Sequence, residues 1–107
     1  MREAVIVSTA RTPIGRAYRG AFNNTCSPTL AGHAISHAVK RAGLDGPEVE
    51  DVIMGSALQQ GSQSSNVARM ATLRAGMPDS VSAMTIDRQC SSGMMAIGLA
   101  AKQILVD

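Results

Sequence analysis

Short apolar runs alternate with amphipathic stretches along this chain, and the alternation predicts its secondary structure. Residues 3–9 (EAVIVST), 51–57 (DVIMGSA) and 81–86 (VSAMTI) are rich in β-branched and other apolar side chains. Nearly continuous apolar runs of this length are typical of strands that are buried on both faces of a parallel sheet. We therefore expect each of these runs to form such a strand.

Helices are expected in the intervals between the strands and after the last of them. Ser27 is a suitable N-cap and Pro28 suits the first helical position; an apolar stripe at helical spacing follows until a glycine ends it. Residues 66–75 and 90–106 predict the second and third helices. The order βαβαβα predicts an α/β fold with a mostly parallel sheet.

The third predicted helix is apolar around almost its whole circumference, and after its first turn only Lys102 and Gln103 are polar. Such a helix is normally buried within a larger body, so we expect a second domain, further chain or another subunit to cover it. Gly93 and Gly98 agree with this, because a glycine inside a helix costs about 1 kcal/mol relative to alanine. Close approach of another backbone is the usual reason for keeping one.

Composition and charge exclude nucleic-acid binding. The net charge is only +2, and Tyr18 and Phe22 are the only aromatic side chains, whereas nucleic-acid binders need a strongly basic surface or rings on which bases stack. Arg11, Arg16 and Arg19 gather near the N-terminus. They belong either to a solvated loop or to a contact with a partner segment or an anionic ligand.

Cysteine usage and hydropathy predict a cytoplasmic protein without membrane association. Two cysteines are too few for a disulfide framework, and both thiols are expected to stay free in a reducing compartment. The N-terminal sequence has no apolar signal region and no cleavage site. The longest apolar stretch is interrupted by Lys102 and Gln103, which does not suit a membrane span.

Cys90 is the candidate catalytic residue, because it lies between the third predicted strand and the start of an apolar helix. The first amide N–H groups of a helix are unpaired and, with the helix dipole, favour an anion. A thiolate is the reactive form of cysteine, and the same N–H groups can hold the oxyanion of an acyl intermediate. Strand, turn, nucleophile and helix in this order form a nucleophile elbow. On position alone, a buried structural cysteine stays an alternative.

Residues 86–97 (IDRQCSSGMMAI), which contain Cys90, closely resemble the nucleophile segment of the thiolases, the acyl-CoA C-acyltransferases; Asp87 stands where many thiolases have Asn. Residues 6–15 (IVSTARTPIG) resemble the thiolase opening. Residues 54–61 (MGSALQQG), continued by NVAR and AGMP, resemble the segment around the second strand and helix. The resemblance covers the whole chain, with the motifs in the family's order.

This resemblance implies acyl transfer through a cysteine thioester at Cys90. Two acyl-CoA molecules condense to a 3-ketoacyl-CoA, or CoA cleaves a 3-ketoacyl-CoA, as in fatty acid metabolism. It implies coenzyme A thioesters as substrates and a homo-oligomer, dimeric or tetrameric. Neither a permanently bound cofactor nor a metal is expected.

The resemblance also implies that residues 1–107 are the first part of the thiolase N-terminal domain and are inactive alone. Thiolases activate the nucleophile with a histidine in a Gly-His-Pro segment, use a second cysteine in a Cys-x-Gly segment, and have an Asn-Glu-Ala-Phe segment, none of which occurs here. Cys26 precedes Ser-Pro, so it is interpreted as a loop or core thiol. His33 and His37 precede alanine and are interpreted as a solvated helix face rather than as metal ligands.

Two other functions stay open on the sequence. The β-ketoacyl synthases also place a cysteine before two serines at the start of a buried helix. The chain could instead be a non-catalytic structural or interaction fragment, which would expose the apolar faces of its third helix and sheet and tend to aggregate or bind a complementary chain.

Overall fold

A computed structural model describes residues 2–107 of the chain. Two short 3₁₀ helices, η1 and η2, accompany the main elements. In chain order the elements are α1 (Ser27–Arg41), η1 (Gly46–Glu48), β1 (Asp51–Gly55), η2 (Gly61–Gln63), α2 (Val67–Arg74), β2 (Ser82–Ile86) and α3 (Ser92–Val106). The three predicted helices and the second and third predicted strands are therefore confirmed, with ends that differ by a few residues.

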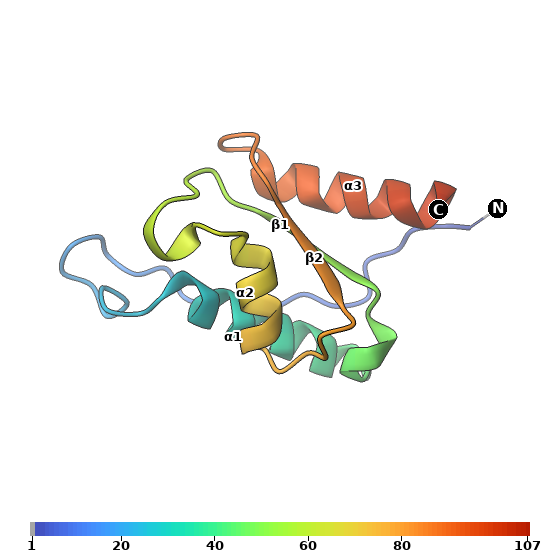
Figure 1. Cartoon of the computed structure of the whole chain (residues 1–107), viewed down its shortest axis with the longest axis horizontal. Coiled ribbons are helices and arrows are strands. Elements are labelled where there is room, and N and C mark those ends of the chain that lie inside the picture. The colour runs from blue at the N-terminus through green and yellow to red at the C-terminus, as the bar shows by residue number, and fades with distance from the viewer. Residues whose placement is uncertain (1) are drawn as a thin grey trace.

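The strands β1 and β2 pair in parallel, from Asp51 opposite Ser82 to Gly55 opposite Ile86, and α2 forms the crossover between them. Helix α3 lies on one side of this sheet and packs on β1, whereas α2 packs on the other side with α1 behind it (Figure 1). The layered α/β architecture with a parallel sheet is the predicted fold class.

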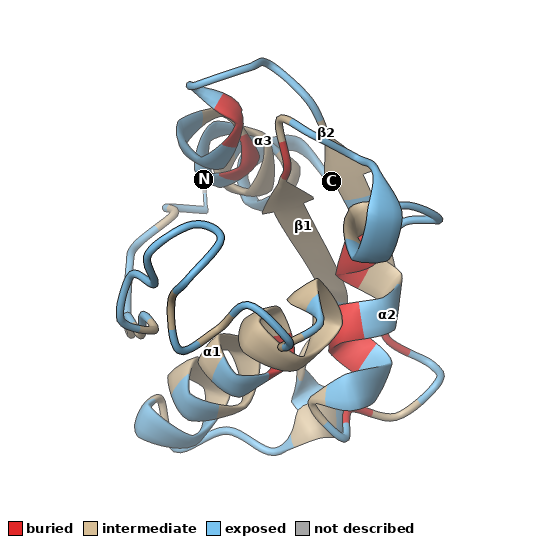
Figure 2. Ribbon diagram, turned by 90° about the vertical axis from the view of Figure 1, so that its left-hand side faces the viewer, coloured by how far each residue is buried: buried red, intermediate tan, exposed pale blue. Residues whose placement is uncertain are grey.

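The buried core lies between α2 and the sheet. It includes Val67, Ala68, Ala71, Thr72 and Val81, and Figure 2 shows the buried positions concentrated on α2. The buried hydroxyl of Thr72 donates to the carbonyl oxygen of Ala68 over 2.7 Å, so this polar atom costs little to bury. The core is small: beyond α2 and Val81, the buried apolar side chains are Met77, after α2, and Ala96 of α3.

Asn66 fixes the start of α2 to strand β2. It is the N-cap of α2 with φ of 59°, and its Oδ1 accepts from the amide of Arg69 over 3.3 Å. The same oxygen accepts from Thr85 Oγ1 over 2.8 Å, and Nδ2 donates to the carbonyl of Ala83 over 3.1 Å. Asparagine is one of the few residues that tolerates the left-handed backbone while capping a helix.

Replacing this cap should lower the stability of the chain. Asn66→Ala removes the cap and both links to β2 and leaves alanine with a positive φ, so we expect the free energy of unfolding to fall by about 2 kcal/mol. Urea denaturation followed by circular dichroism measures this. Asn66→Gly keeps an easy left-handed backbone and should cost less; equal losses would show that backbone strain is unimportant.

The N-terminal segment corrects one sequence prediction. Residues 3–9 do not form a strand within the described part of the chain, and Val5, Ile6 and Val7 are 69%, 74% and 71% exposed. Instead the segment is tied to α1, where Arg41 Nη1 donates to the carbonyl of Thr9 over 2.8 Å. The segment has the apolar pattern of a strand, but a strand needs a neighbouring strand with which its backbone can form hydrogen bonds. Within residues 2–107, β1 and β2 pair only with each other.

Helix α3 is covered on one face only within this chain, and its predicted coverage by a second domain, further chain or another subunit stays a prediction. Only Ser92 and Ala96 of this helix are buried, and Met94 and Ile97 are 77% and 60% exposed. Gly93 and Gly98 face open space, so neither marks a close approach within residues 2–107. One face of α3 packs on β1, and residues 2–107 provide no second layer for its other face.

No helix in the described range is long and apolar enough to cross a membrane.

Candidate active site

The turn between β2 and α3 carries Cys90 and has a strained backbone. Cys90 is exposed, two residues before the first residue of α3. Gln89, directly before it, has φ of 48°. A left-handed backbone at a residue other than glycine is uncommon and is kept where the surroundings enforce it, often at functional sites. The chain therefore turns sharply from strand to helix at the cysteine.

Side chains at both ends hold this turn. The amide of Gln89 donates to Asp87 Oδ1 over 2.8 Å. Ser92 Oγ accepts from the amide of Arg88 over 2.8 Å and donates to the carbonyl of Gln89 over 2.7 Å. Ser92 is only 4% exposed, so these two bonds are largely shielded from water. Together the contacts offset the cost of the strained backbone at Gln89.

Gly55 allows the start of α3 to lie directly on the end of β1. A Cβ at Gly55 would be 2.3 Å from the carbonyl carbon of Ser92 and 2.5 Å from the amide nitrogen of Gly93. No side chain fits in that space, and both atoms are backbone that cannot move independently. This close approach of two backbones, at a strand glycine, was not among the sequence predictions.

The first turn of α3 presents free donors. Within residues 2–107 the amide N–H groups of Gly93 and Met94 have no hydrogen-bond partner. The N-cap Ser91 does not cap them, since its hydroxyl donates back to the carbonyl of Arg88 over 2.9 Å. Unpaired N–H groups at a helix start stabilise negative charge on a neighbouring atom. An exposed thiol thus precedes a helix end that is open to an anion.

The other predicted residues lie away from this turn. Cys26 is the exposed N-cap residue of α1, in agreement with a loop thiol. His33 and His37 are exposed on α1 with ring centroids 4.3 Å apart, as predicted for a solvated face. In the described chain they have no third metal-ligating residue beside them.

Arg11, Arg16 and Arg19 are all exposed, which agrees with a solvated loop. Arg11 also lines a surface hollow of about 520 Å³ together with Arg41 of α1. The alternative of a contact with an anion or a partner segment stays a prediction.

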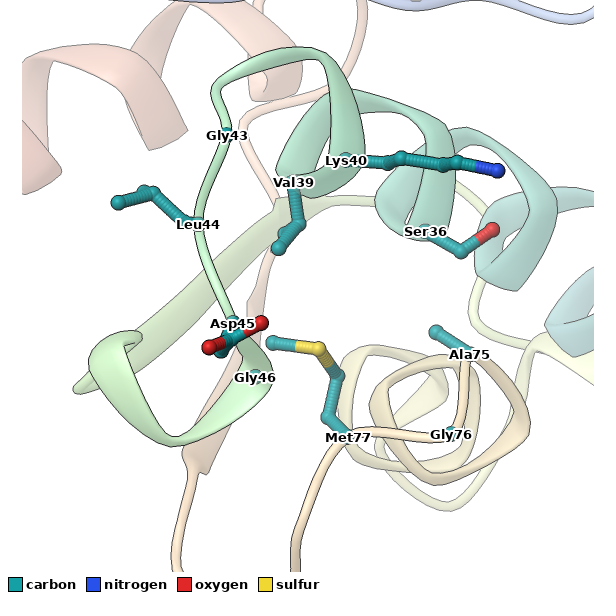
Figure 3. A pocket seen from close by; sticks show the side chains of 10 residues that line it. All are labelled: Ser36, Val39, Lys40, Gly43, Leu44, Asp45, Gly46, Ala75, Gly76 and Met77. Carbon is teal, nitrogen blue, oxygen red and sulfur yellow. The ribbon is translucent and has the colours of Figure 1, made fainter.

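A different hollow lies between the C-terminal ends of α1 and α2 (Figure 3). It measures about 450 Å³, and Lys40 and Asp45 carry the only charged groups on its wall. Its remaining wall is formed by small, hydroxyl and apolar residues, without a nucleophile. Cys90 does not line it, so this hollow is separate from the candidate active site.

Sequence reasoning singled out Cys90 as the candidate but did not identify the residues that shape its turn. Ser92 and Asp87 resemble any polar residues near a helix start until their bonds are seen. Gly55 carries a faint signal, since it ends an apolar strand where glycine otherwise weakens the pattern. Nothing in the sequence marks Gln89 as left-handed.

Fold and turn together define an α/β protein in which a strained strand-to-helix turn presents an exposed cysteine. The description "Thiolase, N-terminal domain" is that of a family model that matches residues 4–107. The chain belongs to the thiolase family. This assignment decides against the β-ketoacyl synthase alternative.

Several thiolases are similar to this chain over nearly all of its length. The 3-oxoadipyl-CoA/3-oxo-5,6-dehydrosuberyl-CoA thiolase of Escherichia coli is 49% identical over 97% of this chain and 26% of its own. The mitochondrial acetyl-CoA acetyltransferase of Xenopus tropicalis is 44% identical over 98% of this chain and 24% of its own. The crystal structure of the Bacillus anthracis acetyl-CoA acetyltransferase superimposes with a TM-score of 0.89 at 46% identity, over 97% of this chain and 26% of that one. The chain thus spans about a quarter of the length of these relatives.

Proposed function

We propose that Cys90 is the nucleophile of an acyl-CoA C-acyltransferase, to which this chain contributes the acyl-accepting thiol. The observation that supports this most directly is the exposed sulfur at a strained elbow, directly before a helix whose first amides are unpartnered. Membership of the thiolase family supports the same chemistry, because relatives named as acetyl-CoA acetyltransferase and 3-ketoacyl-CoA thiolase align with it.

In the proposed first step the Cys90 sulfur adds to the carbonyl carbon of an acyl-CoA thioester. The carbon–sulfur bond to CoA then breaks, CoA leaves with the proton that the thiol gave up, and the acyl group remains on Cys90 as a thioester. In the second step the deprotonated α-carbon of another acyl-CoA attacks this thioester and releases a 3-ketoacyl-CoA and free Cys90. Thiolysis is the reverse. Covalent catalysis divides one difficult carbon–carbon step into two acyl transfers.

Residues 1–107 are proposed to supply the nucleophile without the base that activates it. His33 and His37 lie on the exposed face of α1, and no histidine belongs to the elbow. General acid–base catalysis needs a group within hydrogen-bond reach of the proton it moves. We therefore place the base, the rest of the N-terminal domain and the CoA-binding parts of the enzyme in segments beyond this chain, and expect no turnover by the chain alone.

The proposal can be tested in a hybrid enzyme, in which residues 1–107 replace the matching segment of the Escherichia coli relative that is 49% identical. After brief mixing with acetyl-CoA, acid quenching and proteolysis, mass spectrometry should find one acetyl group on the peptide with Cys90. Cys26 is the internal control, because it is also an exposed free thiol but lies outside the elbow.

An acetyl group on Cys26 as often as on Cys90, in a hybrid that turns over substrate, would contradict the assignment. A soluble hybrid of native size that neither acylates nor turns over would favour the non-catalytic alternative instead.

We also propose a cytoplasmic enzyme of fatty acid metabolism that works as a homo-oligomer. Support for the compartment comes from the two unpaired thiols, which a reducing environment preserves. Support for oligomerisation and for the metabolic role rests on the family alone. Sedimentation of the hybrid enzyme and its activity on acyl chains of increasing length test the last two points.

A further inference from the structure

The hydroxyl of Ser92 is a buried polar group with two partners, and both belong to the turn that carries Cys90. Its Oγ accepts from the amide of Arg88 and donates to the carbonyl of Gln89, over 2.8 and 2.7 Å. Arg88 and Gln89 are the two residues directly before the cysteine. The Ser92 side chain, two residues after Cys90, is therefore hydrogen-bonded to both residues that directly precede the cysteine.

The position of Ser92 is itself fixed. Its backbone rests against Gly55, whose missing Cβ leaves room for it, and its exposed fraction is 4%. Ser92 thus links the end of strand β1, which its backbone contacts, to the turn, which its hydroxyl binds. Without the hydroxyl, the amide of Arg88 would lose its partner in a shielded site. Gln89, whose φ is 48°, would keep its bond to Asp87 but lose the Ser92 hydroxyl at its carbonyl.

We propose that Ser92 is a positioning residue for the acyl-transfer reaction: its hydroxyl holds the elbow so that the Cys90 sulfur and the free amides of α3 keep a reactive arrangement. This inference rests on the proposed function of Cys90. Ser92 acts through the turn and does not touch the substrate. A displacement of about 1 Å at a reacting atom can cost roughly 100-fold in rate, so a loosened turn would affect the chemical step rather than binding.

The first test asks whether the contact holds the turn and uses the 107-residue chain itself. In Ser92→Ala, the amide of Arg88 should exchange with deuterium at least about 10-fold faster, because it loses its acceptor. The buried amides of α2 should stay protected, which shows that the variant folds. Ser92→Thr keeps a hydroxyl and should keep Arg88 protected. Unchanged exchange of Arg88 in a folded Ser92→Ala chain would overturn the proposal.

The second test asks whether the contact serves the reaction and uses the hybrid enzyme. Ser92→Ala should lower kcat about 10- to 100-fold with KM for the acyl-CoA nearly unchanged, and Ser92→Thr should retain most of the kcat. Ser82→Ala is the control, because it removes a serine hydroxyl at the opposite end of β2, whose single proton is shared between the Glu50 carbonyl (3.2 Å) and Asp51 Oδ1 (2.9 Å). It should leave kcat within about threefold of the unsubstituted hybrid.

The outcomes separate the two proposals. If Cys90→Ala is fully active, the proposed function fails. If Cys90→Ala is inactive but Ser92→Ala has normal kcat, or loses activity only as far as Ser82→Ala does, the role of Ser92 fails and the role of Cys90 stands. A raised KM with normal kcat would assign Ser92 to binding and would also overturn the inference.

Discussion

Cys90→Ala should lower kcat/KM of the hybrid enzyme by at least about 10³-fold, because removing a covalent nucleophile leaves only binding and charge stabilisation. No neighbouring thiol can substitute for it, since Cys26 is the N-cap residue of α1 and outside the elbow. The measurement is the rate of CoA-dependent cleavage of a 3-ketoacyl-CoA, followed by the loss of its absorbance.

Cys26→Ala provides the control for this experiment, and it should keep the activity of the unsubstituted hybrid within about twofold. The two substitutions remove the same thiol group from exposed positions, so a general effect of losing a thiol would appear in both. A Cys90→Ala hybrid with more than about a tenth of the original activity would contradict covalent catalysis at this sulfur.

Gly55→Ala should have the second-largest effect and should act on fold and site together. The new Cβ would meet backbone atoms of Ser92 and Gly93 at 2.3–2.5 Å, so β1 and the start of α3 must separate. We expect the chain to lose about 3 kcal/mol of unfolding free energy and the hybrid to lose about 100-fold in kcat. Urea denaturation and steady-state kinetics measure the two effects.

Gly98→Ala is the matched control in the 107-residue chain. Gly98 lies in α3, and nothing is within 4 Å of the Cβ that alanine would add there. Alanine is the better helix former by about 1 kcal/mol, so this variant should be at least as stable as the original chain. Similar losses in both variants would mean that the contact at Gly55 is not what holds α3 to the sheet.

Local sequence patterns were sufficient to predict those elements whose hydrogen-bonding partners lie within the chain. The apolar runs at 51–57 and 81–86 predicted β1 and β2, and these strands satisfy each other's ladder. The same reasoning was wrong for residues 3–9, whose apolar side chains are exposed and whose backbone pairs with neither strand. An alternating or continuous apolar pattern shows that a segment is able to form a strand. Whether it does so depends on a neighbouring strand elsewhere in the fold.

The candidate site divides in the same way. Cys90 could be located from the sequence, because a cysteine between an apolar strand and an apolar helix is a local arrangement, and the surrounding motif resembles that of a known family. The roles of Ser92 and Gly55 could not be predicted, since they depend on the end of β1 meeting the start of α3. Contacts between residues that are far apart in sequence leave little trace in a single sequence.

The two exposed thiols also determine how the chain behaves in air. Cys26 and Cys90 lie on separate elements and both reach the surface. A molecule with one exposed thiol can form only a disulfide-linked dimer. A molecule with two can form a disulfide with a different neighbour through each thiol. Storage without a reducing agent should therefore produce a ladder of covalent polymers on a non-reducing gel, and removing either sulfur should stop that ladder at the dimer.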